Sequence, residues 1–131
     1  LVGGNLHGAS IAVLGAAFKP NSDDVRDSPA LDVAGRLHLS GAKVRVFDPQ
    51  AMANAAKVFP TLTYADSVEE AVRGADLVIV ATEWKEFREA DPVALGGLAA
   101  KRNVIDGRNC LPPQAWIDAG WTYRGMGRFA S

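Results

Sequence analysis

Short apolar runs recur along the chain and are separated by longer amphipathic stretches. Strands are predicted where β-branched and apolar residues cluster, at Ser10–Leu14, Lys43–Phe47, Leu77–Ala81 and Asn103–Ile105, with a weaker fifth candidate at Trp121–Arg124. The run from Leu77 to Ala81 contains no polar residue. Such near-continuous apolar character is typical of a strand that is buried on both faces, as in a parallel sheet.

Helical patterns fill the intervals between these runs. The clearest starts at Ser28-Pro29, because serine is a favoured N-cap residue and proline is favoured at the first helical position. This helix is predicted to stop at Gly41, a residue that suits the end of a helix. Further helices are predicted at Pro49–Val58, Ser67–Arg73, Pro92–Ala100 and Pro112–Ala119.

The alternation of strands and helices predicts an α/β fold: a Rossmann-like three-layer sandwich with a mostly parallel sheet of about five strands. With 131 residues, the whole chain from 1 to 131 is expected to form a single domain. Such sheets bind ligands outside the carboxyl ends of their strands. The segments that directly follow each strand are therefore the candidates for a functional site.

The loop after the first strand, from Gly15 to Asp27, is the most informative of these segments. A dinucleotide-binding turn requires G-x-G-x-x-G that opens directly into a helix, and here only the first glycine is present. The loop instead carries Lys19 and Arg26. It is either a solvated surface loop or an anion site, with lysine as a compact charge and arginine as a planar fork.

Two further segments carry charged residues after strands. An acid such as Asp48 can bind an adenosine ribose, but without the glycine fingerprint Asp48-Pro49 is expected to make a turn and cap the next helix. After the fourth strand, Gly107 permits a tight turn and Arg108 suits bidentate binding of a phosphate or carboxylate. The alternative for Arg108 is a surface ion pair with Asp106.

The segment Thr82–Arg88 combines charged and aromatic residues. Trp84 and Phe87 are three positions apart and would share one side of a short helix, either as packing or as a wall beside a ligand or a neighbouring domain. The single cysteine, Cys110, has no histidine placed to activate it and is not expected to be a nucleophile.

Composition and charge exclude several classes of protein. Hydrophobic residues make up 48% and charged residues 22%, which excludes a disordered tail. The 14 basic and 15 acidic residues give a net charge of -1, so the basic excess of a nucleic-acid-binding protein is absent. One cysteine and two histidines supply no disulfide and no structural zinc site, and the apolar runs are too short to span a bilayer. We therefore expect a cytoplasmic protein with no metal site.

Four segments together resemble one known family. They are Phe18–Pro29, Phe47-Asp48-Pro49, Thr82–Phe87 and Asp106-Gly107-Arg108-Asn109. In this order and spacing they are similar to the C-terminal, UDP-binding domain of the UDP-glucose/GDP-mannose dehydrogenase family. The Thr-Glu-Trp-Lys-Glu-Phe stretch is more similar to the members that act on UDP-glucose. The chain also begins without methionine, which suggests a fragment of a longer protein.

The resemblance implies an NAD-dependent UDP-glucose 6-dehydrogenase that converts UDP-glucose to UDP-glucuronate in two oxidation steps, for use in polysaccharide biosynthesis. It implies that the nucleophilic cysteine, most of the NAD site and a central dimerisation helix belong to an N-terminal portion, so that the parent is a homodimer or larger and this chain alone is inert. By position, Lys19 and Arg108 match residues that bind the UDP-sugar. Arg26 matches an arginine that reaches the NAD side of the cleft between the two portions.

Three alternatives remain at the level of sequence. The same domain could belong to a dehydrogenase for GDP-mannose or a UDP-N-acetyl sugar, because those relatives share the first motif. The chain could be a stand-alone nucleotide-binding regulatory module. It could also be a signalling receiver domain, although such a domain needs acids at its strand ends around a metal ion, and Asp23-Asp24 lies well past the first strand.

Overall fold

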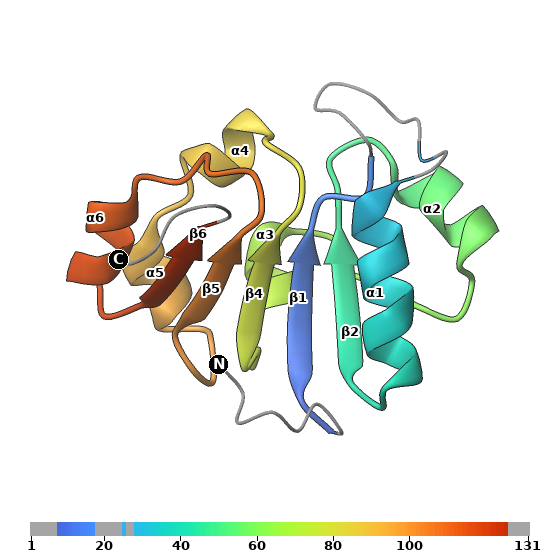
Figure 1. Cartoon of the computed structure of the whole chain (residues 1–131), viewed down its shortest axis with the longest axis horizontal. Helices are drawn as coiled ribbons and strands as arrows, with labels where there is room; N and C mark the ends of the chain where they lie inside the picture. The colour runs from blue at the N-terminus through green and yellow to red at the C-terminus, as the bar shows by residue number, and fades with distance from the viewer. Residues whose placement is uncertain (1–7, 18–24, 26–27, 126–131) are drawn as a thin grey trace.

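The computed structural model describes residues 8–17, 25 and 28–125. Among these residues the strands form one six-stranded sheet in the order β3-β2-β1-β4-β5-β6, and every pair of neighbours is parallel. The strands are β1 (Ser10–Leu14), β2 (Lys43–Phe47), β3 (Thr63–Tyr64), β4 (Leu77–Val80), β5 (Asn103–Asp106) and β6 (Thr122–Gly125). The carboxyl ends of the strands therefore meet at one edge, the upper edge in Figure 1.

Helices cover the sheet on both faces, which confirms the α/β three-layer sandwich. The helices are α1 (Pro29–Leu39), α2 (Met52–Val58), α3 (Val68–Val72), α4 (Lys85–Arg88), α5 (Pro92–Gly96) and α6 (Pro113–Asp118). Helix α1 lies in front of the sheet and α3 and α5 lie behind it (Figure 1). Side chains from successive strand positions alternate between two buried clusters, one against α1 and α2 and the other against α3, α5 and α6.

Helix α1 forms where the sequence predicts it. Ser28 is its N-cap residue, and the Ser28 hydroxyl accepts a hydrogen bond from the Leu31 N–H at 3.3 Å. Gly41 follows the helix with a φ of 93°, a conformation that favours glycine. The helix packs Leu31 and Ala34 against β1 and β2, so its first turn lies at the carboxyl edge of the sheet.

The expectation of about five strands is corrected to six. Strand β3 was not predicted, because it has only two residues and pairs with β2 only through Arg45–Thr63 and Val46–Tyr64. A run this short carries no periodicity that distinguishes it from a loop.

Several predicted boundaries are also corrected, with the largest differences at α2 and α5. Helix α2 begins at Met52 rather than Pro49, because the residues after Asp48 first make a turn on its carboxylate. Strand β4 ends at Val80 rather than Ala81, and α5 ends at Gly96 rather than Ala100. Two successive glycines, Gly96 and Gly97, weaken the helix at that point.

The strand order excludes the receiver-domain alternative. Receiver domains have the order 2-1-3-4-5, whereas this sheet has the order 3-2-1-4-5-6 of the Rossmann fold. Among the described residues, no helix is both long enough and apolar enough to cross a membrane.

Candidate functional site

The candidate site lies where the order of the strands reverses. Strand β1 has β2 on one side and β4 on the other, so the connections that follow β1 and β4 leave the sheet in opposite directions. In an open α/β sheet this switch point is where ligands bind. The segments at the switch point begin at Gly15 after β1 and at Ala81 after β4, and the turn after β5 lies beside them.

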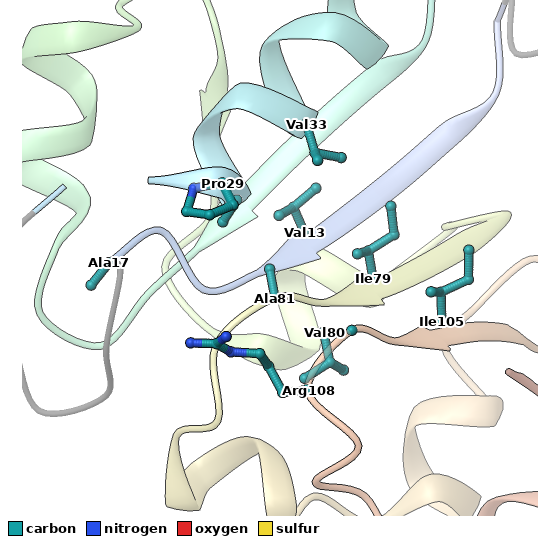
Figure 2. A pocket seen from close by; sticks show the side chains of 11 residues that line it. Val13, Ala17, Pro29, Val33, Ile79, Val80, Ala81, Ile105 and Arg108 are labelled. Atoms are coloured by element: carbon teal, nitrogen blue, oxygen red, sulfur yellow. The ribbon is translucent and has the colours of Figure 1, made fainter. Parts of the chain in front are cut away.

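A cavity of about 350 Å³ opens at this edge, on the α1 side of the sheet. Its walls are apolar side chains from α1 and from the three central strands, among them Val33, Ile79 and Ile105 (Figure 2). Arg108 also lines the cavity, and its side chain extends from the turn after β5 toward the side of β1. Apolar walls with one placed cation suit a ligand that has a flat apolar part and an anionic part.

All the polar or charged side chains that are buried in the described part of the chain lie at this same edge. They are Ser28, Asp48, Thr82 and Asp106, each at most 6% exposed. Burying a polar group without a partner is costly, so each of these groups is expected to have a structural partner. The hydrogen bonds below show that these four residues fix the backbone of the segments around the cavity.

The Asp48 carboxylate accepts hydrogen bonds from five N–H donors. Its Oδ1 accepts from the backbone N–H groups of Gln50 and Ala51, both at 2.8 Å, which is the predicted turn after β2. Its Oδ2 accepts from the N–H groups of Ala16 and Ala17, at 2.8 and 3.1 Å, and from Trp84 Nε1 at 3.1 Å. Helix α2 itself has Ala51 as its N-cap residue and no side-chain cap, so Asp48 forms the turn but does not cap the helix.

These contacts also test whether the described residues could bind NAD in the usual way. In a dinucleotide-binding turn, backbone N–H groups after the first strand face the pyrophosphate, and an acid binds the ribose. Here the N–H groups of Ala16 and Ala17 donate to Asp48, and both oxygens of Asp48 are used. The described residues therefore do not fit the NAD pyrophosphate and ribose.

The carbonyl groups of the same two alanines are fixed as well. The Ser28 hydroxyl donates to the Ala16 carbonyl at 2.6 Å, and the Thr82 hydroxyl donates to the Ala17 carbonyl at 2.9 Å. Gly15 precedes them with a φ of 111°, and a Cβ at that position would lie 2.6 Å from Thr82 Cβ. At the start of the loop after β1, the N–H and carbonyl groups of both alanines are therefore hydrogen-bonded to side chains.

Trp84 and Phe87 are packing residues and not a wall beside the cavity. Trp84 is 6% exposed and Phe87 is fully buried, and both belong to the cluster on the α3 side of the sheet. Phe87 makes an edge contact with Phe47, with ring centroids 6.2 Å apart. The first of the two readings of this segment is the one that the structure supports.

Arg108 lies in the turn that follows β5, as predicted. Gly107 is required there, because a Cβ would lie 2.9 Å from the Val80 carbonyl oxygen. Asp106 is fully buried and does not lie on the surface, so the alternative of a surface pair with Arg108 does not fit. Lys19 and Arg26, the other predicted cations, lie outside the described residues.

The sequence alone does not indicate the roles of Ser28, Thr82 and Tyr123 at this edge. The sequence predicts Ser28 only as a helix cap, whereas its hydroxyl also donates to the Ala16 carbonyl. The Tyr123 hydroxyl donates to Asp106 at 2.8 Å from a neighbouring strand. The sequence does offer a signal for Thr82, since it directly follows the predicted strand Leu77–Ala81. The partner of Tyr123 depends on the order of the strands in the sheet.

No group of three or more metal-ligating side chains occurs among the described residues. Cys110 is half-buried, and its thiol donates a weak hydrogen bond to Asp106 Oδ1 at 3.7 Å. Burial raises the pKa of the Cys110 thiol to about 12, and the negative charge of Asp106 acts in the same direction. The thiol is therefore protonated at neutral pH, and a protonated thiol is a poor nucleophile.

Alkylation of Cys110 by iodoacetamide is expected to be slow at neutral pH. Because the pKa is raised, the reactive thiolate appears only as the pH rises toward about 12. As long as the pH is below about 12, the labelling rate should rise about tenfold for each unit by which the pH is increased. The measurement is the labelling rate of the folded chain by mass spectrometry, with the chain in urea as a fast-reacting control. Equal rates in the folded chain and in urea at neutral pH would contradict the prediction.

Comparison with known proteins assigns the chain to a family. Residues 12–113 match the family model described as "UDP-glucose/GDP-mannose dehydrogenase family, UDP binding domain". UDP-glucose 6-dehydrogenase YwqF of Bacillus subtilis is 38% identical over 128 residues, and UDP-glucose 6-dehydrogenase of Rhizobium meliloti is 40% identical over 126 residues. These matches cover 97% and 96% of this chain but only 29% of each relative.

Solved structures agree with this assignment. The crystal structure of an NDP-N-acetyl-D-galactosaminuronic acid dehydrogenase from Methanosarcina mazei has a TM-score of 0.85 and 32% identity, and the match covers 97% of this chain and 26% of that one. The structure of a UDP-glucose dehydrogenase from Pyrobaculum islandicum has a TM-score of 0.77 and 36% identity, and the match covers 93% of this chain and 26% of that one. The similarity thus extends over nearly the whole sheet and its helices. The chain belongs to the UDP-glucose/GDP-mannose dehydrogenase family and is the C-terminal, UDP-binding domain of that family.

Proposed function

We propose that this chain is the nucleotide-sugar-binding part of an NAD-dependent UDP-glucose 6-dehydrogenase. The whole enzyme would oxidise the C6 alcohol of UDP-glucose to the carboxylate of UDP-glucuronate, with NAD as the hydride acceptor. The observation that carries the proposal is Arg108 at an apolar cavity at the strand switch point. The similarity to UDP-glucose 6-dehydrogenases supports the choice of substrate.

Arg108 is proposed to bind the anionic part of the sugar nucleotide. A diphosphate needs fixed cations, and the guanidinium group can donate two parallel hydrogen bonds to phosphate oxygens. The apolar side chains beside it line the rest of the cavity, where the uncharged part of the ligand would lie. Lys19 is proposed as a second cation for the same ligand, because it lies on the loop that follows β1 in the sequence.

The remaining proposed roles rest on the resemblance to the family. Arg26 is proposed to reach the NAD side of the cleft between the two portions of the enzyme. NAD itself is proposed to bind mainly to the N-terminal portion, since the described residues do not fit its pyrophosphate and ribose. No residue of this chain, 1–131, is proposed to be catalytic.

The proposed partners are the sugar nucleotide and the N-terminal portion of the same chain. The enzyme is proposed to be a cytoplasmic homodimer or larger assembly that binds neither nucleic acid nor membrane. The near-neutral charge of -1 supports the first of these exclusions. The activity, the substrate and these partners are proposed for the whole enzyme. This chain matches only 29% of the length of each of the two relatives.

Calorimetric titration tests the proposal. The full-length enzyme is expected to bind UDP and UDP-glucose more tightly than GDP-mannose or a UDP-N-acetyl sugar. This chain alone is expected to bind UDP weakly, with a dissociation constant above the micromolar range. A site shared between two portions loses contacts when one portion is absent, while the cost of ordering the ligand remains. This chain alone is also expected to produce no NADH. Preference for GDP-mannose or an N-acetyl sugar would change the assigned substrate, and tight UDP binding or NADH production by this chain alone would contradict the shared site.

A further inference from the structure

The turn that carries Arg108 is fixed by a side chain from a different strand. Asp106 is the last residue of β5, and its carboxylate is fully buried. The phenol hydroxyl of Tyr123, in the edge strand β6, donates a hydrogen bond to Asp106 Oδ2 at 2.8 Å. Tyr123 also lies beyond residues 12–113, the part of the chain that matches the family model.

Both ends of the turn converge on the Asp106 carboxylate. Oδ1 accepts a hydrogen bond from the Arg108 backbone N–H at 3.2 Å, and Oδ2 accepts one from the Leu111 N–H at 2.8 Å. Between them, Asn109 has a φ of 53°, a left-handed conformation that is uncommon for a residue other than glycine. The carboxylate thus holds the backbone on both sides of a residue in an uncommon conformation.

The sheet register explains why Tyr123 can reach Asp106. In the β5–β6 pair, Tyr123 lies opposite Val104 and Gly125 lies opposite Asp106. Tyr123 is therefore a diagonal neighbour of Asp106 on the adjacent strand. A diagonal neighbour on an adjacent strand is within reach of an aromatic side chain.

We propose that Tyr123 and Asp106 are positioning residues for Arg108 and thereby set the affinity of the site for its anionic ligand. This inference rests on the proposed function, in which Arg108 binds the sugar nucleotide. Tyr123 holds the Asp106 carboxylate, and the carboxylate holds the backbone N–H of Arg108. A side chain that starts from a fixed backbone loses less conformational freedom when it binds the ligand.

The test replaces Tyr123 with phenylalanine in the full-length enzyme. Tyr123→Phe removes the hydroxyl and retains the ring, which packs against the core. The KM for UDP-glucose is expected to rise about three- to tenfold, which is the loss of affinity that corresponds to one hydrogen bond. The kcat is expected to change less than about twofold, and the melting temperature by no more than in the control variant.

The matched control is Tyr64→Phe. The Tyr64 hydroxyl donates to the Phe59 carbonyl at 2.8 Å, the same length as the Tyr123 bond, and Tyr64 is half-buried like Tyr123. Tyr64 is in β3, the edge strand at the opposite side of the sheet from β6. Tyr64→Phe is therefore expected to leave the KM for UDP-glucose unchanged.

A double-mutant cycle with Arg108→Ala shows whether Tyr123 acts through Arg108. Tyr123→Phe is expected to raise the KM in the native background and to add nothing in the Arg108→Ala background. An undiminished effect in that background would overturn the inference. So would a fall in kcat and melting temperature with an unchanged KM, which is the signature of a purely structural role.

The same measurements separate this inference from the proposed function. If Arg108→Ala raises the KM and Tyr123→Phe does not, the positioning role is wrong and the proposed site stands. If Arg108→Ala itself leaves the KM unchanged, the proposed site is wrong and the positioning role is wrong with it.

Discussion

Replacing Arg108 with alanine in the full-length enzyme is expected to weaken the use of UDP-glucose by about ten- to a hundredfold in kcat/KM. A charge-assisted hydrogen bond contributes about 1.5–3 kcal/mol, and about 1.4 kcal/mol corresponds to a factor of ten. Arg108 lines the cavity at the switch point, where its loss would leave an anionic ligand against apolar walls. Steady-state kinetics with both UDP-glucose and NAD varied measure the effect.

Two further variants make this prediction specific. Arg108→Lys is expected to restore activity only in part, because an ammonium group cannot replace a planar fork that donates two parallel bonds. Lys19→Ala is expected to have an effect of the same size on UDP-glucose, whereas Arg26→Ala is expected to raise the KM for NAD more than that for UDP-glucose. If Arg108→Ala and Lys19→Ala both leave the kinetics unchanged in folded enzyme, the substrate binds elsewhere.

Replacing Asp48 with alanine is expected to lower the free energy of unfolding by at least about 3 kcal/mol. The substitution leaves five N–H donors from three segments without their acceptor, and each buried donor left unpaired costs about 1–3 kcal/mol. Water that enters the space would satisfy some of them, so the loss is expected to be smaller than the sum. Urea denaturation of the purified chain measures the change.

Asp32→Ala is the matched control for this substitution. Asp32 lies in the first turn of α1 and pairs with Arg36 at 3.1 Å, and both side chains are exposed. An exposed ion pair contributes about 0–1 kcal/mol, so this variant is expected to be nearly as stable as the native chain. Similar small losses for Asp48→Ala and Asp32→Ala would contradict the role assigned to Asp48.

The sequence was sufficient for the elements that have a long and regular pattern. Strand β1 and strand β2 have the predicted bounds, because β1 is rich in apolar residues and β2 alternates charged and apolar residues with a period of two. The N-terminus of α1 was predicted from Ser28 and Pro29, because capping is a local interaction within four residues. The two-residue strand β3 was not, since its existence depends on pairing with β2 and not on its own pattern.

The candidate site was also predictable from the sequence only in part. The sequence placed Arg108 after a strand and therefore at the carboxyl edge, and it favoured a turn at Asp48 over a ribose ligand because the glycine fingerprint is absent. It did not show that Asp48 fixes Ala16 and Ala17, since these residues are more than thirty positions apart in sequence. Nor did it show that Trp84 is a partner of Asp48.

The sequence by itself determined the fold class, the family and the strand ends at which a ligand would bind, because periodicity and short motifs are local properties of the chain. Only the tertiary structure decided which buried groups are partners and where the cavity lies. Tyr123 and Asp106 meet because β5 and β6 are adjacent and in a register that places Gly125 opposite the aspartate. That register follows from the packing of the whole sheet against its helices, and no short stretch of the sequence contains it.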